Sequence, residues 1–259
     1  MKLFITDFED TLIDSDGAIP LSTMIEIDRM RKDGIQFGVC SGKILKTILD
    51  YNRDFPFLDY IICCHGAFVY DVINRKVLFK KAIGGSIVKR VHKLYHDKTI
   101  YFSTGYDYSV CHEEVVSSYT KNRSLSFLEF YDLNKDHIYK MDIVFDTKKE
   151  RDSAYDELYE LGLKATFIKS KKKKKEYVLE IVAKDVNKTK GLEKICKTQH
   201  ISLDDVCFVG TCEDDIPIFL SVGISASLSN GCKKLKKVAS MESSSNDTKG
   251  VEKVIKKLI

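Results

Sequence analysis

The chain has 259 residues, of which 44% are hydrophobic and 31% are charged. This length supports one or two domains with substantial cores, and the composition excludes a disulfide-rich mini-protein, a disordered chain and a membrane-embedded protein. The formal charge is +4, but five of the 42 basic residues form the single run Lys171 to Lys175. Outside this run, 37 basic residues are balanced by 38 acidic ones, so nucleic acid is not expected as a partner.

Short apolar runs alternate with a helical pattern at the start of the chain. Residues 2–6 and 35–40 are apolar and end in polar residues, which is typical of buried strands. Between them, Pro20 precedes apolar residues at helical spacing and Gly34 follows, which predicts an amphipathic helix. Residues 58–64 repeat the strand pattern. Strands joined across a helix predict a parallel sheet with helical crossovers.

The rhythm changes after residue 66. Residues 67–71 and 76–79 flank Asn74-Arg75, which predicts a hairpin. Helix and strand patterns then mix over residues 82–183, which predicts an inserted α+β domain. The strand patterns cover residues 99–104, 139–145, 164–168 and 177–181, and the helical patterns cover residues 87–95 and 150–161.

The alternation of helix and strand patterns that is typical of a parallel sheet resumes in the last third of the chain. The expected elements are a helix over 188–198, a strand over 206–209, a helix over 214–220 and a strand over 223–227. The predicted fold class is therefore α/β, with a Rossmann-like parallel-sheet core made of residues 1–81 and 184–259.

Polar side chains follow several of the predicted core strands. Ligands bind beyond the carboxyl ends of parallel strands, because loops and helix amino termini converge there. Carboxylates gathered around a lysine and a few hydroxyls require a cation, and Mg²⁺ is the hard cation that accompanies phosphate-bearing substrates. The residues concerned are Asp7, Glu9, Asp10, Thr11, Ser41, Lys43, Lys188, Thr211, Asp214 and Asp215.

These segments resemble the four motifs of the haloacid dehalogenase-like (HAD) superfamily, in the same order. Residues 7–12 (DFEDTL) are similar to the first motif, DxDGTL, and residues 38–43 (GVCSGK) to the second, which usually ends in TGR. Lys188 is similar to the lysine of the third motif, and residues 210–217 (GTCEDDIP) to the fourth, GDGENDIPM. Residues 61–67 (IICCHGA) resemble a segment of the Cof-type branch, subfamily IIB, which carries a large α+β cap.

The resemblance implies a magnesium-dependent phosphatase that works through an aspartyl-phosphate intermediate. Asp7 would be the nucleophile, and Glu9 would stand at the position of the general acid and base. Small phosphate monoesters, such as sugar phosphates or related metabolites, would be the substrates. Phosphate would be bound by Ser41, Gly42 and Lys188. The ligands of Mg²⁺ would be Asp7, Glu9 through its backbone carbonyl, and Asp214 or Asp215. Further candidate site residues are Thr11, Asp10, Lys43 and Thr211.

Three positions depart from the family pattern. Glu9 and Thr211 stand where the family has aspartate, and Asp10 replaces a glycine. Aspartate tolerates a positive φ better than most residues, whereas a hydroxyl is a poor substitute for an anionic Mg²⁺ ligand. Two readings follow: a working phosphatase with a rearranged metal site and reduced activity, or a degenerate protein that binds a phosphorylated ligand or partner without turnover. The retention of Asp7, Ser41 and Lys188 favours the first.

Other features receive simpler interpretations. His92 and His96 are four residues apart on a predicted helix but lack a third metal ligand, so a solvated face is expected. The lysine run is expected to be a solvated turn. The eight cysteines contain no Cys-X-X-Cys pair, so most should be reduced and buried, with Cys212 as a bystander.

The sequence also predicts where the protein resides. Acidic residues appear within the first ten positions, so no secretory signal is expected. No stretch approaches the ~18–20 apolar residues needed to cross a bilayer. These observations predict a cytoplasmic protein without membrane association, and they leave its oligomeric state open.

Overall fold

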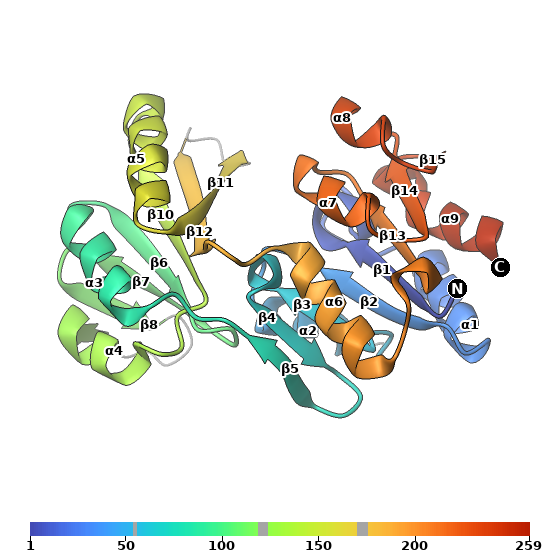
Figure 1. Cartoon of the computed structure of the whole chain (residues 1–259), viewed down its shortest axis with the longest axis horizontal. Coiled ribbons are helices and arrows are strands. Elements are labelled where there is room, and N and C mark those ends of the chain that lie inside the picture. The colour runs from blue at the N-terminus through green and yellow to red at the C-terminus, as the bar shows by residue number, and fades with distance from the viewer. Residues whose placement is uncertain (54–55, 119–123, 170–175) are drawn as a thin grey trace. The chain divides into compact units, whose positions relative to one another are not determined.

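The computed structural model describes residues 1–53, 56–118, 124–169 and 176–259, and these residues divide into two units. The first unit comprises Met1–Gly42, Ile48–Phe79 and Asn187–Ile259; the second comprises Lys43–Thr47 and Lys80–Val186 (Figure 1). The lysine run 171–175 lies outside the described residues. The expectation that the inserted residues act as a cap concerns both units together and stays a prediction.

An eight-stranded sheet forms the centre of the first unit, in the order β15-β14-β13-β1-β2-β3-β4-β5. β1 (Leu3–Asp7) pairs in parallel with both β13 (Val206–Gly210) and β2 (Gln36–Cys40), which confirms the predicted parallel core. β4 (Phe68–Asp71) instead runs antiparallel to β3 (Tyr60–Cys63). The remaining strands are β5 (Lys76–Lys80), β14 (Ile224–Leu228) and β15 (Met241–Ser243).

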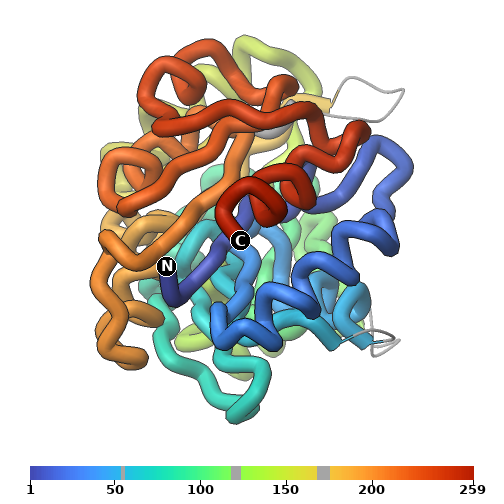
Figure 2. The backbone as a smooth tube through the Cα atoms, turned by 90° about the vertical axis from the view of Figure 1, so that its right-hand side faces the viewer, coloured from blue at the N-terminus to red at the C-terminus, as the bar shows by residue number. Residues whose placement is uncertain are grey.

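Helices pack against this sheet. Alternation along β1 directs Leu3 and Ile5 into a core that they share with Leu192 of α6 and Ile218 of α7. α1 and α9 pack against each other, and Figure 2 shows both ends of the chain on the same side of this unit. The helices and helical turns are α1 (Leu21–Lys32), α2 (Leu45–Asn52), α6 (Lys188–Gln199), α7 (Ile216–Phe219), α8 (Lys233–Lys236), α9 (Gly250–Leu258), η1 (Phe8–Leu12), η2 (Cys64–Gly66), η3 (Leu203–Asp205), η4 (Glu213–Asp215) and η5 (Asn246–Thr248).

The helix predicted over 214–220 has a different start. Residues Glu213–Asp215 form a 3₁₀ turn (η4), and the α-helix begins only at Ile216. The physical reason is that the carboxylate of Asp215 turns back to the amides of Thr211 and Cys212, which holds this loop in a tight turn.

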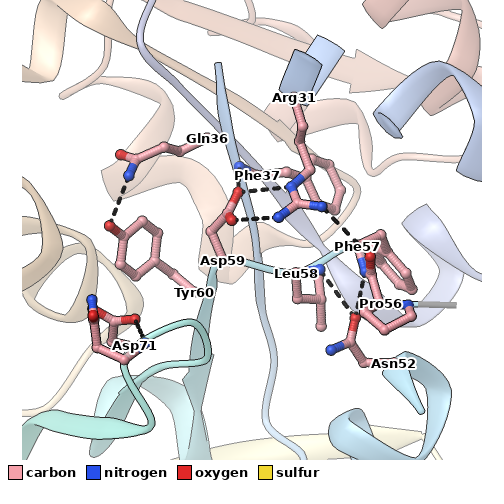
Figure 3. Close-up of polar contacts among 11 residues, drawn as sticks. Arg31, Gln36, Phe37, Asn52, Pro56, Phe57, Leu58, Asp59, Tyr60 and Asp71 are labelled. Carbon is pink, nitrogen blue, oxygen red and sulfur yellow. Dashed lines mark hydrogen bonds and ion pairs between the residues drawn. The ribbon is translucent and has the colours of Figure 1, made fainter. Parts of the chain in front are cut away.

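A bidentate ion pair fixes the loop that leads into β3. Nε and a terminal nitrogen of Arg31 donate to the two carboxylate oxygens of Asp59, at 3.0 and 2.7 Å (Figure 3). Oδ2 of Asp59 also accepts the amide of Phe37, at 2.8 Å. Three hydrogen bonds on one buried carboxylate therefore tie α1, the start of β2 and the start of β3 together.

The second unit contains a seven-stranded antiparallel sheet, in the order β11-β12-β10-β6-β7-β8-β9. Met141, Ile143 and Phe145 on β10 face a core shared with the helices, whereas Nζ of Lys140 bonds Asp142 and Glu180, at 3.1 and 2.8 Å. The fold has the α+β composition that the sequence predicts. Its elements are α3 (Gly85–Leu94), α4 (Phe127–Asn134), α5 (Lys148–Glu160), β6 (Thr99–Ser103), β7 (Tyr108–His112), β8 (Val115–Ser118), β9 (Ser124–Ser126), β10 (Lys140–Phe145), β11 (Leu163–Lys169) and β12 (Tyr177–Ala183).

The interpretation of His92 as part of a solvated face is wrong. His92 is buried, its ring stacks on Phe127 with centroids 3.5 Å apart, and its Nε2 lies 3.0 Å from the carbonyl oxygen of Glu113. His96 is exposed, as expected. The two side chains differ because Phe127, the first residue of α4, stacks on His92.

Two further expectations can be compared with the described residues. All eight cysteines are free, and six of them are buried, which confirms the expectation of reduced core residues. Within the described ranges, the helices are too short or too polar to traverse a lipid bilayer.

Candidate active site

The first side chain of the site comes from the carboxyl end of β1. Asp7 is the last residue of this central strand and is only 4% exposed. The chain then makes a five-residue turn, closed by a hydrogen bond from the amide of Ile13 to the carbonyl of Phe8, at 3.1 Å. Within it Asp10 has a φ of +55°, so this position adopts the left-handed conformation, which glycine takes most easily and aspartate tolerates better than most residues.

Asp7, Lys188 and Asp215 form a buried ionic cluster. Nζ of Lys188 lies 2.9 Å from Oδ1 of Asp7 and 2.7 Å from Oδ1 of Asp215. The three side chains are 7% exposed or less. The structure therefore brings together residues that the sequence placed in the first, third and fourth motifs. Lys188 is the first residue of α6, whose start is fixed by the side chain of Asn187, which accepts the amide of Lys190.

The loop after β13 positions Asp215. Its Oδ2 accepts the backbone amides of Thr211 and Cys212, at 3.1 and 3.0 Å. Gly210 makes room for this arrangement, because a Cβ at that position would lie 2.5 Å from Oδ2. Both oxygens of Asp215 are thus held by donors, and the carboxylate has a fixed orientation toward Lys188.

Thr211, which the sequence resemblance matches to the family aspartate, is buried. Its Oγ1 lies 3.0 Å from Oγ1 of Thr11, so the two hydroxyls join the turn after β1 to the loop after β13. This bond gives both threonines a structural role. It also shows that the hydroxyl at position 211 supplies a neutral oxygen, without the charge of a carboxylate.

Burial and the neighbouring charges set the ionisation of the cluster. Burial raises the pKa of Asp7 to about 7; the charge of Lys188 opposes this rise, while those of Asp215 and Glu9 add to it. Burial by itself would lower the pKa of Lys188, but Asp215 and Asp7 together raise that pKa well above its usual value. Lys188 therefore stays an ammonium ion between the carboxyl groups of Asp7 and Asp215.

The second-motif residues lie at the same edge of the sheet. β2 neighbours β1 with Cys40 opposite Asp7, and Ser41 is the next residue. Ser41 is buried; its amide donates to Ile62 and its carbonyl accepts the amide of His65. The phosphate-binding roles of Ser41 and Gly42 remain predictions. Lys43 belongs to a segment grouped with the second unit, so its place at this site is a prediction as well.

Two contacts that support the loops of this site were not predicted from the sequence. Nδ2 of Asn230 donates to the carbonyl of Asp10, at 2.8 Å, and so stabilises the turn after β1, although the two residues are 220 positions apart in the sequence. Gly66 lets η2 pack directly on the start of α6, because a Cβ there would overlap the carbonyl of Asn187. The glycine in the segment IICCHGA was the only sequence signal for the contact of Gly66 with Asn187. The sequence carried no signal for the contact of Asn230 with Asp10.

The donor set fits a divalent cation. Asp7, Cys212 and Asp215 each offer one ligand atom, and these atoms lie within 4.8 Å of one another. Two buried carboxylates share a single ammonium ion, and the charge of Glu9 also reaches Asp7. Mg²⁺ is commonly held by one or two carboxylates together with waters and substrate phosphate, and this site offers the carboxylates of Asp7 and Asp215. The roles of Glu9 and Asp214 as ligands remain predictions.

Comparison with known proteins agrees with this geometry. A family model described as haloacid dehalogenase-like hydrolase matches residues 4–255. The chain belongs to this family. The sequence-based assignment to the HAD superfamily is thereby confirmed, and the protein is a hydrolase of that superfamily.

Individual relatives of this HAD hydrolase are distant in sequence. A putative phosphatase, MG265, from Mycoplasma genitalium is 24% identical, over 92% of this chain and 91% of its own length. A solved haloacid dehalogenase-like hydrolase from Bacteroides thetaiotaomicron has a TM-score of 0.79 at 17% identity, covering 100% of this chain and 99% of its own. The HAD subclass IIB sugar phosphatase BT4131 has a TM-score of 0.78 at 19% identity, with 100% and 99% covered. The fold is thus shared with subclass IIB structures.

Proposed function

We propose that the chain is a magnesium-dependent phosphatase that hydrolyses small phosphate monoesters through an aspartyl-phosphate on Asp7. The observation that carries this proposal is the buried cluster in which Lys188 bridges Asp7 and Asp215 at the carboxyl edge of the parallel sheet. Relatives named as phosphatases support the reaction class. Sugar phosphates or similar metabolites in the cytoplasm are the proposed substrates, with no nucleic-acid or membrane partner.

Asp7 is suited to nucleophilic attack. Its Oδ1 accepts the hydrogen bond from Lys188, while no hydrogen bond from the described residues reaches its Oδ2. Oδ2 therefore keeps its lone pairs for phosphorus, and Lys188 fixes the direction in which they point. In the first step a bond forms between Oδ2 and phosphorus, and the bond from phosphorus to the leaving oxygen breaks.

Glu9 is the proposed proton carrier. Its carboxyl proton passes to the leaving oxygen in the first step, and its carboxylate then takes a proton from the water that attacks the aspartyl-phosphate. The second displacement breaks the bond between Asp7 and phosphorus and regenerates both side chains. Glutamate extends one methylene further than the family aspartate, and small misplacements of this kind can cost about 10²-fold in rate.

The remaining groups stabilise charge. Lys188 offsets charge on the transferring phosphoryl group, with Ser41 and the amide of Gly42 as the proposed hydrogen-bond donors. A bound Mg²⁺ would supply positive charge that offsets the negative charge of the reacting groups. Asp7, the carbonyl of Glu9 and Asp214 or Asp215 are its proposed ligands.

A phosphate-release assay tests this function. The wild type is offered a panel of phosphate monoesters, including sugar phosphates, with Mg²⁺ or with a chelator. We expect release that requires Mg²⁺, disappears in Asp7→Asn and persists in Asp16→Asn, a matched change at an exposed position on the same stretch of chain. A folded wild type that binds phosphorylated ligands and releases no phosphate would support the degenerate reading instead.

A further inference from the structure

Two asparagines from the last part of the chain hold the turn after β1. Nδ2 of Asn246, the first residue of η5, donates to the carbonyl of Ile13, at 3.0 Å. Nδ2 of Asn230, in the loop after β14, donates to the carbonyl of Asp10, at 2.8 Å. The two asparagines are joined to each other, because the amide of Asn246 donates to Oδ1 of Asn230, at 3.3 Å. Two linked side chains therefore hold the middle and the end of this turn.

The loop that carries Asn230 is itself tied to the site. The amide of Cys232 donates to the carbonyl of Thr211, at 2.9 Å, which joins this loop to the loop after β13. A Cβ at Gly231 would lie 2.7 Å from Oγ of Ser227, so the glycine lets the loop close tightly against β14. Asn230 is thus presented to the turn after β1 from a fixed backbone.

The backbone of the turn determines where the carboxyl group of Glu9 lies. Glu9 is extended, with φ −76° and ψ 138°, and Asp10 then takes the left-handed conformation, with φ +55°. A left-handed residue that carries a Cβ persists only when its surroundings hold it, and the bonds from Asn230 and Asn246 do so here. The charge of Glu9 adds to the rise in the pKa of Asp7, so its carboxyl group lies near the proposed nucleophile.

We propose that Asn230 and Asn246 are positioning residues that hold the carboxyl group of Glu9 within reach of the leaving oxygen. Their role rests on the proposed function, in which the proton of Glu9 passes to the leaving oxygen as the bond from that oxygen to phosphorus breaks. Proton transfer requires the two heavy atoms to come within about 2.6–3.2 Å of each other. Glutamate is longer than aspartate, so this distance depends strongly on a fixed backbone. Loss of either bond would lower the fraction of molecules in which Glu9 is correctly placed.

Two substrates that differ in the proton demand of their leaving groups test this role. An alkyl phosphate that the wild type hydrolyses needs a proton on its leaving oxygen, whereas para-nitrophenyl phosphate releases a phenolate that is stable without one. In single turnovers we expect Asn230→Ala and Asn246→Ala to slow release of the alcohol at least about tenfold and release of the phenolate less than about threefold. A merely structural role would slow both releases equally. Asn74→Ala removes a bond to Asp71 in the same unit and should change neither.

A second measurement does not depend on turnover. Hydrogen exchange of the amides in residues 8–13 should become faster in Asn230→Ala, and unchanged exchange would show that the bond does not hold the turn. Asn230 is exposed, so its variant should fold normally and decides the matter if the variant of the buried Asn246 unfolds; circular dichroism checks both. Equal slowing of the two substrates, or alcohol release at the wild-type rate, would overturn the positioning role and leave the phosphatase standing. A wild type that hydrolyses no phosphate ester would contradict the proposed function, and the positioning role with it.

Discussion

Nζ of Lys188 lies 2.9 Å from Oδ1 of Asp7, although 181 positions separate the two residues in the chain. The same nitrogen lies 2.7 Å from Oδ1 of Asp215, which comes from a third segment. One ammonium ion thus compensates two buried carboxylates, and both the stability of this edge of the sheet and the proposed chemistry depend on it.

Replacing Lys188 by Met removes this shared cation. Two buried carboxylates would lose their cationic partner, so we expect the free energy of unfolding to fall by about 3–5 kcal/mol and phosphate release to be lost. Urea unfolding measures the first effect. Lys190→Met, on the exposed side of the same helix, is the control and should change stability little. Equal stabilities of the two variants would show that the carboxylates do not need the ammonium ion.

Thr211→Asp introduces the carboxylate that the resemblance to the fourth motif predicts at this position. Without metal, a third carboxylate near Asp7 and Asp215 should lower the melting temperature. With Mg²⁺ the melting temperature should rise, because an added anionic ligand should tighten Mg²⁺ binding by about tenfold. Thermal melts at a series of Mg²⁺ concentrations measure this. Thr211→Asn has the same shape without the charge, and an identical Mg²⁺ response in both variants would argue against a cation at this site.

The ion pair between Arg31 and Asp59 should contribute to stability without contributing to catalysis. Asp59→Ala leaves the guanidinium and the buried amide of Phe37 without their acceptor, and we expect a loss of about 2–3 kcal/mol in unfolding free energy. Asp28→Ala removes an exposed pair with Lys32 on the same helix and should cost about 0.3–0.5 kcal/mol. Because Asp59 precedes β3 and lies far along the strands from Asp7, turnover per folded molecule should be retained. Equal losses in the two variants would contradict the account.

The contact between α1 and α9 should depend on pH. Hydrogen bonds from Lys256 and Ser22, both 2.6 Å long, lower the pKa of Glu252 below its ordinary 4.5. A lowered pKa means that the stabilisation is present above the unfolded value and is lost as the pH falls through the folded one. The stability difference between wild type and Glu252→Gln should thus be largest near neutral pH, below about 1 kcal/mol because Lys256 is half-exposed, and should vanish in acid. A difference that does not change with pH would show that the charge of Glu252 has no part in it.

Local patterns were sufficient for much of the fold. The strand over 206–209 and the helix over 188–198 were predicted within a residue or two, because each buries one periodic set of apolar side chains. β7 to β9 and α4 were not predicted, because Ser, Tyr and Glu interrupt the apolar pattern there. The burial of His92 could not be predicted either, because it depends on Phe127, which a separate helix supplies.

The site, too, could be predicted only in part from the sequence. Motif order predicted that Asp7, Lys188 and Asp215 would meet, because strand ends of a parallel sheet share one edge. The bond between Thr11 and Thr211 and the hold of Asn230 on the turn after β1 were not predicted. Both depend on the three-dimensional packing of loops, for which spacing along the chain gives no rule.

The most direct test of the account is to find the phosphoryl group on Asp7. Wild-type protein is mixed with Mg²⁺ and a phosphate monoester that it hydrolyses. The reaction is quenched with acid within milliseconds, and the protein is digested for mass spectrometry. We expect one phosphoryl group on the peptide that contains Asp7, and neither this adduct nor phosphate release in Asp7→Asn. Phosphate release by Asp7→Asn at the wild-type rate, or a phosphoryl group on another residue, would contradict it.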